Sequence, residues 1–420
     1  MPVLYIVILL VAFVLLGAPL FTIIGTISLL GFSSQGIDTA AIIVEMYRLA
    51  SQPVLLAIPL FTVSGYFLAE SKAPQRLVAL AQALVGWMPG GLAIVVLVSC
   101  AVFTAFTGGS GITIVALGGL VFPILMAEHY DEKFVLGLVT TSGSLGLLFP
   151  PSLPIILYGT VAEVSIDSLF RAGIVPGIVL VVVLAIYSIR QGVASKIGRH
   201  PFDAKKLWIA FKNVAWEIPL PFFIIGGIYG GYFTATEAAA VTAFYVFIVE
   251  VFIYKDLKLT TDVPRVMKES MVLVGAILMI LATAMGLTSY LIDQQIPQQL
   301  FELIRQVVES KTLFLVILNF FLLIIGMMME IFSAIVVVPL IVPIAKQYGV
   351  DPIHLGIIFL ANLEIAYLMP PVGMNLFMSS FRFRKSIGQV AVATLPFILV
   401  LLVGLLIITY VPQLSLWLVK

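Results

Sequence analysis

The sequence holds little of what a catalytic centre requires. A single cysteine, Cys100, occurs among 420 residues, which excludes an internal disulfide framework and a metal site built from several thiolates. The three histidines, His129, His200 and His354, have no nucleophile motif or metal-ligand partner near them in the sequence. No Walker-type phosphate-binding loop is present, so ATP does not drive this chain directly. We therefore expect no enzyme, and a membrane-embedded hydrolase is a disfavoured alternative.

Charge is scarce as well. Only 10% of the residues are Asp, Glu, Lys or Arg, and the formal net charge is +1. So small a balance gives no reason to expect a nucleic-acid partner. Hydrophobic residues make up 61% of the chain, more apolar surface than a soluble core can bury. The composition predicts an all-α polytopic membrane protein surrounded by the lipid bilayer.

Long apolar runs fill the chain in two sets of similar rhythm. The first set lies at about 3–16, 18–32, 54–69, 91–107, 112–126, 134–162 and 172–189. The second set lies at about 216–232, 235–253, 271–291, 312–328, 333–345, 354–380 and 390–411. The first run has no basic segment before it and no convincing cleavage site after it, so we interpret it as a retained span and not a signal peptide.

An internal duplication explains the two sets. A shift of 220 residues places Pro123 on Pro343, Asp131 on Asp351, Pro150 on Pro370, Pro151 on Pro371 and Pro176 on Pro396. Prolines are common in membrane helices and could coincide, but five ungapped matches favour a repeat. We expect a first repeat at 1–200, with scaffold helices at 1–90 and transport elements at 91–190, and a second repeat at 201–420, with scaffold helices at 201–311 and transport elements at 312–411.

The basic residues predict how the repeats are oriented. Three stretches rich in Lys and Arg, at 190–212, 254–268 and 381–386, should be cytoplasmic. The chain meets this requirement only if the apolar pairs at 91–126 and 312–345 are re-entrant hairpins that enter and leave on one side. Each half then crosses the membrane five times. Because five is odd, the two repeats are inverted relative to each other, and both termini are periplasmic.

Each half also contains a broken helix. "SLGLLFPPSLP" (144–154) and "EIAYLMPPVGM" (364–374) both carry Pro-Pro, which removes backbone donors and releases carbonyls one turn earlier. The first break offers Ser142 and Ser144 with the carbonyls of Gly143, Gly146 and Phe149. The second offers Asn362, Glu364 and Asn375 with carbonyls around Ala366 and Met369. Such backbone is tolerated in a membrane only where protein or a watery cavity covers it.

The turn of the first hairpin is "TGGSG", Thr107–Gly111. The carbonyls at the end of the first leg, with the hydroxyls of Thr107 and Ser110, suit a hard cation such as sodium. The N–H groups that begin the second leg suit a carboxylate. We predict that the substrate is bound by Gly108, Gly109, Gly111, Ser144, Asn362 and Asn375. Alternatively, the glycines only permit close packing between helices.

Two acids lie within apolar sequence. The 220-residue shift places Glu330 on Ser110 and Glu364 on Ser144. An ionisable side chain inside the membrane favours a functional role, and a helix-end acid wetted by the interface is the alternative. Inverted repeats with interrupted helices are typical of secondary transporters, which bind substrate and ions near the membrane midplane.

Several motifs resemble one known family. "NLEIAYLMPPVGMNLF", "LGLLFPPSLPIILYG" and "TATEAAAVTAFYVF" are similar to motifs of the large membrane subunit of tripartite ATP-independent periplasmic (TRAP) transporters of the C4-dicarboxylate type. The resemblance runs essentially end to end. It implies a sodium-driven importer of organic acids in the bacterial inner membrane, working by an elevator motion. It also implies two partners, a small four-helix membrane subunit and a periplasmic substrate-binding protein.

The resemblance further implies two sites for the coupling ion, Na⁺. The first comprises Thr107, Ser110, Gly143, Gly146 and Pro150. The second comprises Met329, Glu330, Glu364, Tyr367 and Met369. The second tip, "MMMEIFSA", departs from the family's commoner pattern because bulky Ile331 and Phe332 stand where smaller or hydroxyl residues are frequent. The alternative function is a stand-alone anion/sodium symporter or antiporter of the same architecture, which would need no partner for uptake.

Overall fold

The computed structural model of the chain describes residues 12–13, 16–88, 90–194 and 202–419. Within these residues every regular element is helical, so the predicted all-α class is confirmed. Most of the predicted first span, at about 3–16, lies outside the described residues, as does the predicted boundary between the repeats at 200 and 201.

The helices follow the predicted apolar runs. In the first half they are α2 (Leu20–Ser34), α3 (Ala40–Ala50), η1 (Pro53–Leu56), α4 (Ala57–Glu70), α5 (Ala73–Val85), α6 (Gly91–Thr107), α7 (Ser110–Thr113), η2 (Ile114–Gly118), α8 (Gly119–Ala127), α9 (Glu132–Ser142), η3 (Leu145–Leu148), α10 (Leu153–Ala162) and α11 (Ile166–Ala194). In the second half they are α12 (Ala204–Asn213), α13 (Pro219–Tyr229), α14 (Ala235–Ile248), η4 (Val249–Ile253), α15 (Asp262–Asp293), α16 (Ile296–Arg305), α17 (Lys311–Met328), α18 (Ile331–Ala334), η5 (Ile335–Val337), α19 (Val338–Gln347), α20 (Pro352–Ala366), α21 (Met374–Phe383), α22 (Ile387–Tyr410) and α23 (Gln413–Leu416).

The chain is a multi-pass membrane protein. Among the described residues, seven helices are long and apolar enough to cross a membrane, and eight if one bent pair is counted as a span. That pair is the predicted first broken helix, residues 132–162, which bends by 45° at its break. Four shorter helices, α3, α5, α12 and α16, were not predicted. Each mixes polar with apolar residues, so a search for long apolar runs passes over it.

Corresponding elements recur in the two halves. Asp131 caps α9 and Asp351 caps α20, each accepting a backbone N–H with its side chain. Cis peptide bonds join Pro150 to Pro151 and Pro370 to Pro371. The first leg of each hairpin is of similar length, 17 residues in α6 and 18 in α17. The long helices α11 and α22, which come after the two breaks, each contain an interior proline. The secondary structure of the two halves thus matches at the positions that the 220-residue shift aligns.

The repeats also contact each other reciprocally. Helix α9 packs against α22, and its counterpart α20 packs against α11. Likewise α10 contacts α18 and α19, while its counterpart α21 contacts α7 and η2. The Ser144 hydroxyl lies 3.3 Å from the Glu364 carbonyl, a contact between positions 220 residues apart. Reciprocal contacts, with equivalent positions meeting at the centre, are the pattern of a two-fold relation.

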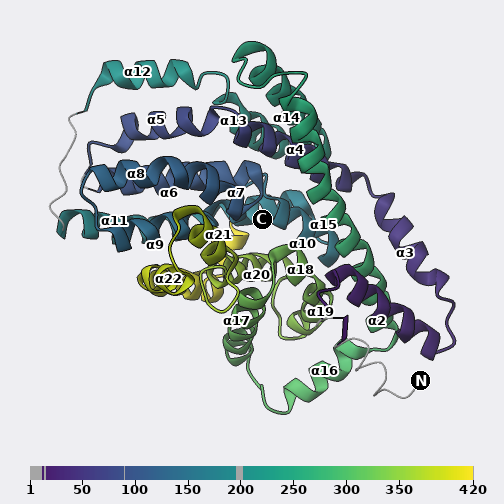
Figure 1. Cartoon of the computed structure of the whole chain (residues 1–420). Coiled ribbons are helices and arrows are strands. Elements are labelled where there is room, and N and C mark those ends of the chain that lie inside the picture. The colour runs from purple at the N-terminus through teal and green to yellow at the C-terminus, as the bar shows by residue number, and fades with distance from the viewer. Residues whose placement is uncertain (1–11, 14–15, 89, 195–201, 420) are drawn as a thin grey trace.

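The remaining helices form a second packed group. Figure 1 shows α2, α3, α4, α14 and α15 together along one side of the molecule, where α4 packs on α14 and α15 packs on α2, α3 and α4. This group meets the first hairpin at Gly65 of α4. A Cβ atom at Gly65 would lie 2.5 Å from the Phe106 carbonyl oxygen and 2.6 Å from the Thr107 Cα atom. Only a glycine lets α4 approach the hairpin backbone so closely.

Candidate functional site

The first hairpin turns within two residues. Helix α6 ends at Thr107, Gly108 adopts the left-handed conformation with φ of 65°, and α7 begins at Ser110. Gly109 between them is extended, with φ of −133°. Thr107 and Ser110 are both buried. The predicted "TGGSG" turn is therefore present, and its two hydroxyl residues lie inside the protein.

Gly108 and Gly109 should respond differently to alanine. A Cβ atom at Gly108 would need the left-handed conformation and would lie 2.6 Å from the Leu153 side chain, whereas one at Gly109 would come no closer than 3.4 Å to Ile112. We expect Gly108→Ala to lower the initial transport rate at least about fivefold, from about 1 kcal/mol of backbone strain and the added clash. Uptake into proteoliposomes measures this. Equal rates for Gly108→Ala and Gly109→Ala would contradict the account of the turn.

Hydroxyl groups join the hairpin to the first break. The Thr104 hydroxyl lies 2.7 Å from the Thr113 hydroxyl and 2.9 Å from the Gly143 carbonyl oxygen. Thr107 Oγ1 lies 3.4 Å from Thr113 Oγ1. A Cβ atom at Gly143 would come within 3.3 Å of the Ser110 carbonyl oxygen. The structure thus brings Thr107, Ser110 and Gly143 together, as the predicted first ion site requires.

The carbonyls of the first break are less free than expected. The Gly143 carbonyl accepts from Thr104, and the Gly146 carbonyl accepts from the Phe149 N–H at 3.0 Å. A carbonyl oxygen has two lone pairs, so each retains one. A Cβ atom at Gly146 would lie 2.4 Å from the Ala101 carbonyl oxygen, which explains why glycine stands here. Pro150, which directly follows Phe149 in the chain, is buried.

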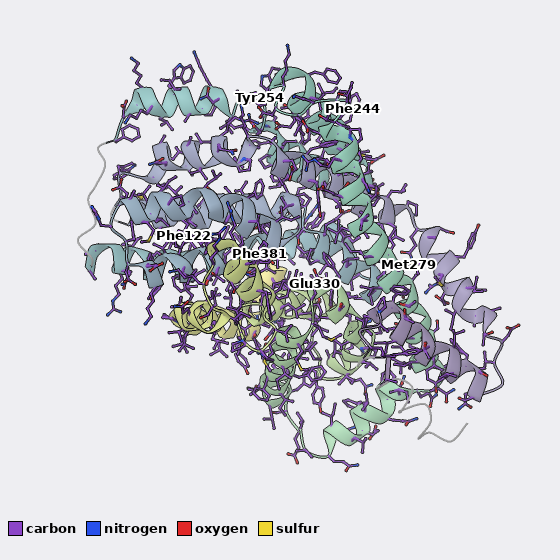
Figure 2. The ribbon with its side chains drawn as sticks, viewed as in Figure 1. Phe122, Phe244, Tyr254, Met279, Glu330 and Phe381 are labelled. Carbon is purple, nitrogen blue, oxygen red and sulfur yellow. The ribbon has the colours of Figure 1, made fainter. Side chains whose placement is uncertain are left out.

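The second hairpin turns at Met329 and Glu330. Met329 is extended, and the Glu330 carbonyl accepts backbone hydrogen bonds that begin α18. The Glu330 side chain is half-buried, and Figure 2 places it near the centre of the molecule. The Val372 N–H donates to the Met327 carbonyl at 3.2 Å, which ties this hairpin to the second break. The tip and the break predicted for the second ion site are therefore neighbours.

Glu364 lies buried in α20, two residues before that helix ends. Its side chain is 1% exposed, and neither carboxylate oxygen has a hydrogen-bond partner among the described residues. Tyr367 and Met369 form the turn that follows, and their carbonyls accept from the N–H groups of Asn375 and Gly373. An ionised carboxylate without a partner is costly to bury, so this side chain is suited either to a bound cation or to a proton.

The two breaks differ in how open they are. Pro150 and Pro151 in the first break are buried, whereas Pro370 and Pro371 in the second are exposed. Val372 next to them is also exposed. In this structure the second break therefore opens to the surroundings, while the first is closed.

The predicted substrate residues divide between two places. Ser144 contacts the Glu364 backbone at the centre of the repeats. Asn375 of α21 donates to the Thr140 carbonyl at 3.1 Å, and its side-chain oxygen has no hydrogen-bond partner among the described residues. Gly111 faces the same helix, since a Cβ atom there would lie 3.2 Å from Met378. The first hairpin tip, the end of α9 and the start of α21 thus meet.

Asn362 contacts the first leg of the second hairpin. Its amide nitrogen donates to Asn319 Oδ1 of α17 at 2.7 Å, and Asn319 in turn donates to the Thr409 hydroxyl of α22 at 3.2 Å. These bonds fasten the second hairpin to the broken helix. The Asn362 amide nitrogen is thus engaged on the face of α20 toward α17, while its side-chain oxygen has no hydrogen-bond partner among the described residues.

Sequence reasoning missed Thr104 and Thr113. Thr104 lies one helical turn before Thr107 on α6, so the three-residue spacing of two hydroxyls in an apolar helix was an available signal. Thr113 follows Ser110 at the same spacing. With Thr107 and Ser110 they supply several neutral oxygens around one turn. Neutral hydroxyl and carbonyl oxygens suit a hard monovalent cation, and the unpartnered Glu364 carboxylate suits a cation at the second site.

Comparisons with known proteins give the same architecture. Residues 6–414 match the DctM component of tripartite ATP-independent periplasmic transporters. The chain is 38% identical over 394 residues to the C4-dicarboxylate TRAP transporter large permease protein DctM of Pseudomonas aeruginosa, covering 93% of this chain and 92% of that protein. It is 35% identical to the isethionate TRAP transporter permease protein DctMQ of Oleidesulfovibrio alaskensis, covering 86% of this chain and 58% of that protein.

A solved structure shares the fold. The YdaH transporter of Alcanivorax borkumensis aligns with a TM-score of 0.64 and 14% identity, covering 90% of this chain and 87% of that chain. The named relatives are permeases, in agreement with the expectation of a protein that is not an enzyme. Match length, identity and fold agree, and the chain belongs to the DctM family of large permease subunits of tripartite ATP-independent periplasmic transporters.

Proposed function

We propose that this chain is the transport subunit of a sodium-coupled importer of organic-acid anions in the bacterial inner membrane. It receives its substrate from a periplasmic substrate-binding protein and works with a small four-helix membrane subunit. The observation that supports this most is the meeting of a hydroxyl-lined hairpin turn and two helix breaks, one holding the unpartnered Glu364 carboxylate. A dicarboxylate is the first candidate substrate, since a relative that matches 93% of this chain is named for C4-dicarboxylates.

Sodium fits both sites chemically. Around Thr107 and Ser110 the chain offers hydroxyl and carbonyl oxygens at a helix end, where the dipole is negative. Around Glu364 it offers a full negative charge. Bound there, sodium would supply the positive charge that lets these oxygens remain buried and that attracts an anionic substrate. Thr107, Ser110 and Gly143 would hold one ion, and Glu364 with the Tyr367 and Met369 region the other.

The substrate anion would bind between the tip of the first hairpin and α21, and not at either sodium site. The Asn375 side chain lies on the opposite wall, where its amide nitrogen donates to the Thr140 carbonyl and its oxygen has no hydrogen-bond partner among the described residues. The span Ser110–Ala127 begins at the turn, and the first N–H groups of a helix have no partner within the helix. Carboxylates and sulfonates both accept such donors, which agrees with the C4-dicarboxylate and isethionate names of the two relatives.

An elevator motion with inverted repeats accounts for the packing. Reciprocal contacts between the halves support a two-fold relation within the group α6–α11 and α17–α22. The second packed group, α2, α3, α4, α14 and α15, contacts the first hairpin at Gly65, and α15 contacts α18 and α19 of the second hairpin. We propose that the first group moves along the second. The charge distribution of the loops, which puts the stretches at 254–268 and 381–386 in the cytoplasm and both termini in the periplasm, supports the inverted orientation.

Uptake into proteoliposomes tests the function. The chain, its small membrane partner and the binding protein are reconstituted, and labelled succinate is supplied under an inward sodium gradient. We expect accumulation that needs all three components and stops when choline replaces sodium. Accumulation by this chain alone would favour the stand-alone symporter. Accumulation of none of a panel of di- and monocarboxylates and sulfonates by the folded three-part complex would contradict the substrate class.

A further inference from the structure

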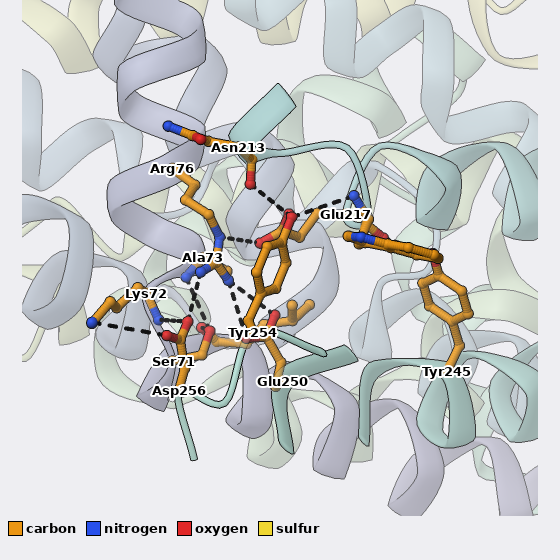
Figure 3. Close-up of polar contacts among 12 residues, drawn as sticks. Ser71, Lys72, Ala73, Arg76, Asn213, Glu217, Tyr245, Glu250, Tyr254 and Asp256 are labelled. Carbon is orange, nitrogen blue, oxygen red and sulfur yellow. Dashed lines mark hydrogen bonds and ion pairs between the residues drawn. The ribbon is translucent and has the colours of Figure 1, made fainter. Parts of the chain in front are cut away.

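A buried charge cluster lies away from the hairpins and breaks. Arg76 of α5 binds three carboxylates from other segments: Glu217 before α13, Glu250 of η4 and Asp256 before α15 (Figure 3). The Asp256 bond is 2.6 Å and the Glu250 bonds are 3.1 and 3.3 Å. The guanidinium also lies 3.9 Å from the centre of the Tyr254 ring.

The acids outnumber their cations. The side chains of Glu217, Glu250 and Asp256 are 4%, 0% and 6% exposed, while the shared Arg76 side chain is 12% exposed. Among the described residues, one further cation forms an ion pair with the cluster: the largely exposed Lys72 ammonium, 4.0 Å from Asp256. Three ionised carboxylates, one guanidinium and this ammonium would leave a surplus negative charge. The Arg76 guanidinium occupies the centre, so a metal ion cannot take that place.

Buried carboxylates that crowd one cation share a proton. Like charges in contact disfavour ionisation of one partner, and loss of water around the group acts in the same direction. Tyr254 is the other titratable group present, and its hydroxyl lies 2.9 Å from Glu217 Oε2, which it stabilises as a carboxylate. Asp256 has the shorter contacts, including the Lys72 backbone N–H at 3.0 Å. Glu250 is the most buried and has only the longer bonds to Arg76.

We propose that this cluster binds an exchangeable proton, held on Glu250, and that the proton fastens α5 to the body formed by α13–α15. The cluster joins the short helix that leads into the first hairpin to three segments of the second half. Helix α16 holds the corresponding place before the second hairpin, and it packs on α19 and α15. Loss of the proton leaves Glu250 negatively charged beside Glu217 and Asp256. The repulsion among these carboxylates weakens the ionic attachment of α5 to the three segments. This inference rests on the fold and does not depend on the proposed substrate or coupling ion.

Hydrogen exchange of the α5 amides in nanodiscs tests the proposal. A carboxyl protonated only in the folded state makes that state bind more protons, so the attachment weakens as pH rises. After correction for the intrinsic rate, wild-type α5 should exchange about tenfold faster at about pH 8.5 than at about pH 6, the effect of about one pKa unit. Glu250→Gln, which mimics the protonated acid, should keep α5 protected throughout.

The control is Glu70→Gln, which removes an exposed acid paired with Arg265 nearby and should leave the wild-type pH dependence unchanged. Infrared difference spectra of the wild type give a second readout that needs no variant. They should show a protonated-carboxyl band that fades as pH rises. Exchange of wild-type α5 that is independent of pH, or the absence of that band, would overturn the proposal.

Discussion

Glu364→Gln is expected to raise the sodium concentration for half-maximal uptake at least about tenfold. The substitution keeps the shape of the side chain and removes its charge. Since Glu364 is 1% exposed and its carboxylate oxygens have no hydrogen-bond partner in the part of the chain that the structure describes, a bound cation is the partner that would stabilise an ionised group there. Hydrogen bonds and contacts to charged groups contribute about 1.5–3 kcal/mol, which corresponds to roughly tenfold or more in affinity. Initial uptake rates at varied sodium measure this.

The matched control is Asn362→Asp, two residues earlier on the same helix. Asn362 is engaged with Asn319, so a change there should impair packing of the second hairpin without a selective loss of sodium affinity. Glu364→Gln with full sodium-driven accumulation and an unchanged sodium dependence would make Glu364 a structural acid. Loss of accumulation with retained substrate exchange would point to proton coupling instead.

Gly65→Ala is expected to reduce the uptake rate about tenfold. A methyl group at this position would enter the backbone of Phe106 and Thr107, which lie 2.5 and 2.6 Å from the Cβ position. Overpacking of this kind costs about 1–3 kcal/mol, because neither backbone has room to withdraw. If the first hairpin slides along α4, the variant disfavours the state described here, in which α4 touches the hairpin backbone, and uptake slows.

Gly275→Ala supplies the control for this substitution. Gly275 lies on α15 in the same group of helices, and a Cβ atom there would meet nothing within 4 Å. It should transport at the wild-type rate. Wild-type uptake by Gly65→Ala would show that α4 and the hairpin need not approach this closely during transport.

Local signals in the sequence predicted much of the site. Pro-Pro within an apolar run marks a helix break whatever surrounds it, because proline lacks a donor, and both breaks lie where expected. The same holds for the turn at Gly108, where the left-handed conformation favours glycine. Asp131 and Asp351 were matched by the repeat and both prove to be helix caps.

The missed features depend on which helices become neighbours. Arg76 and its three acids come from segments up to 180 residues apart, as its bond to Asp256 shows. Glu250 lies near the end of an apolar run, which indicates a buried charge, but the sequence does not predict that Arg76 is its partner. Asn362 was assigned to the substrate because it lies in the second broken segment. Its hydrogen bond to Asn319 follows from the face of α20 that meets α17, which one sequence does not disclose.

Binding of radioactive sodium to the purified chain tests the central claim most directly. The account predicts saturable binding to the wild type, weakened at least about tenfold by Glu364→Gln and weakened also by Ser110→Ala, with the control Gly275→Ala unchanged. Folded wild-type protein that binds no sodium saturably, or variants that bind it as the wild type does, would contradict the claim that the hairpin turns and helix breaks form the ion sites.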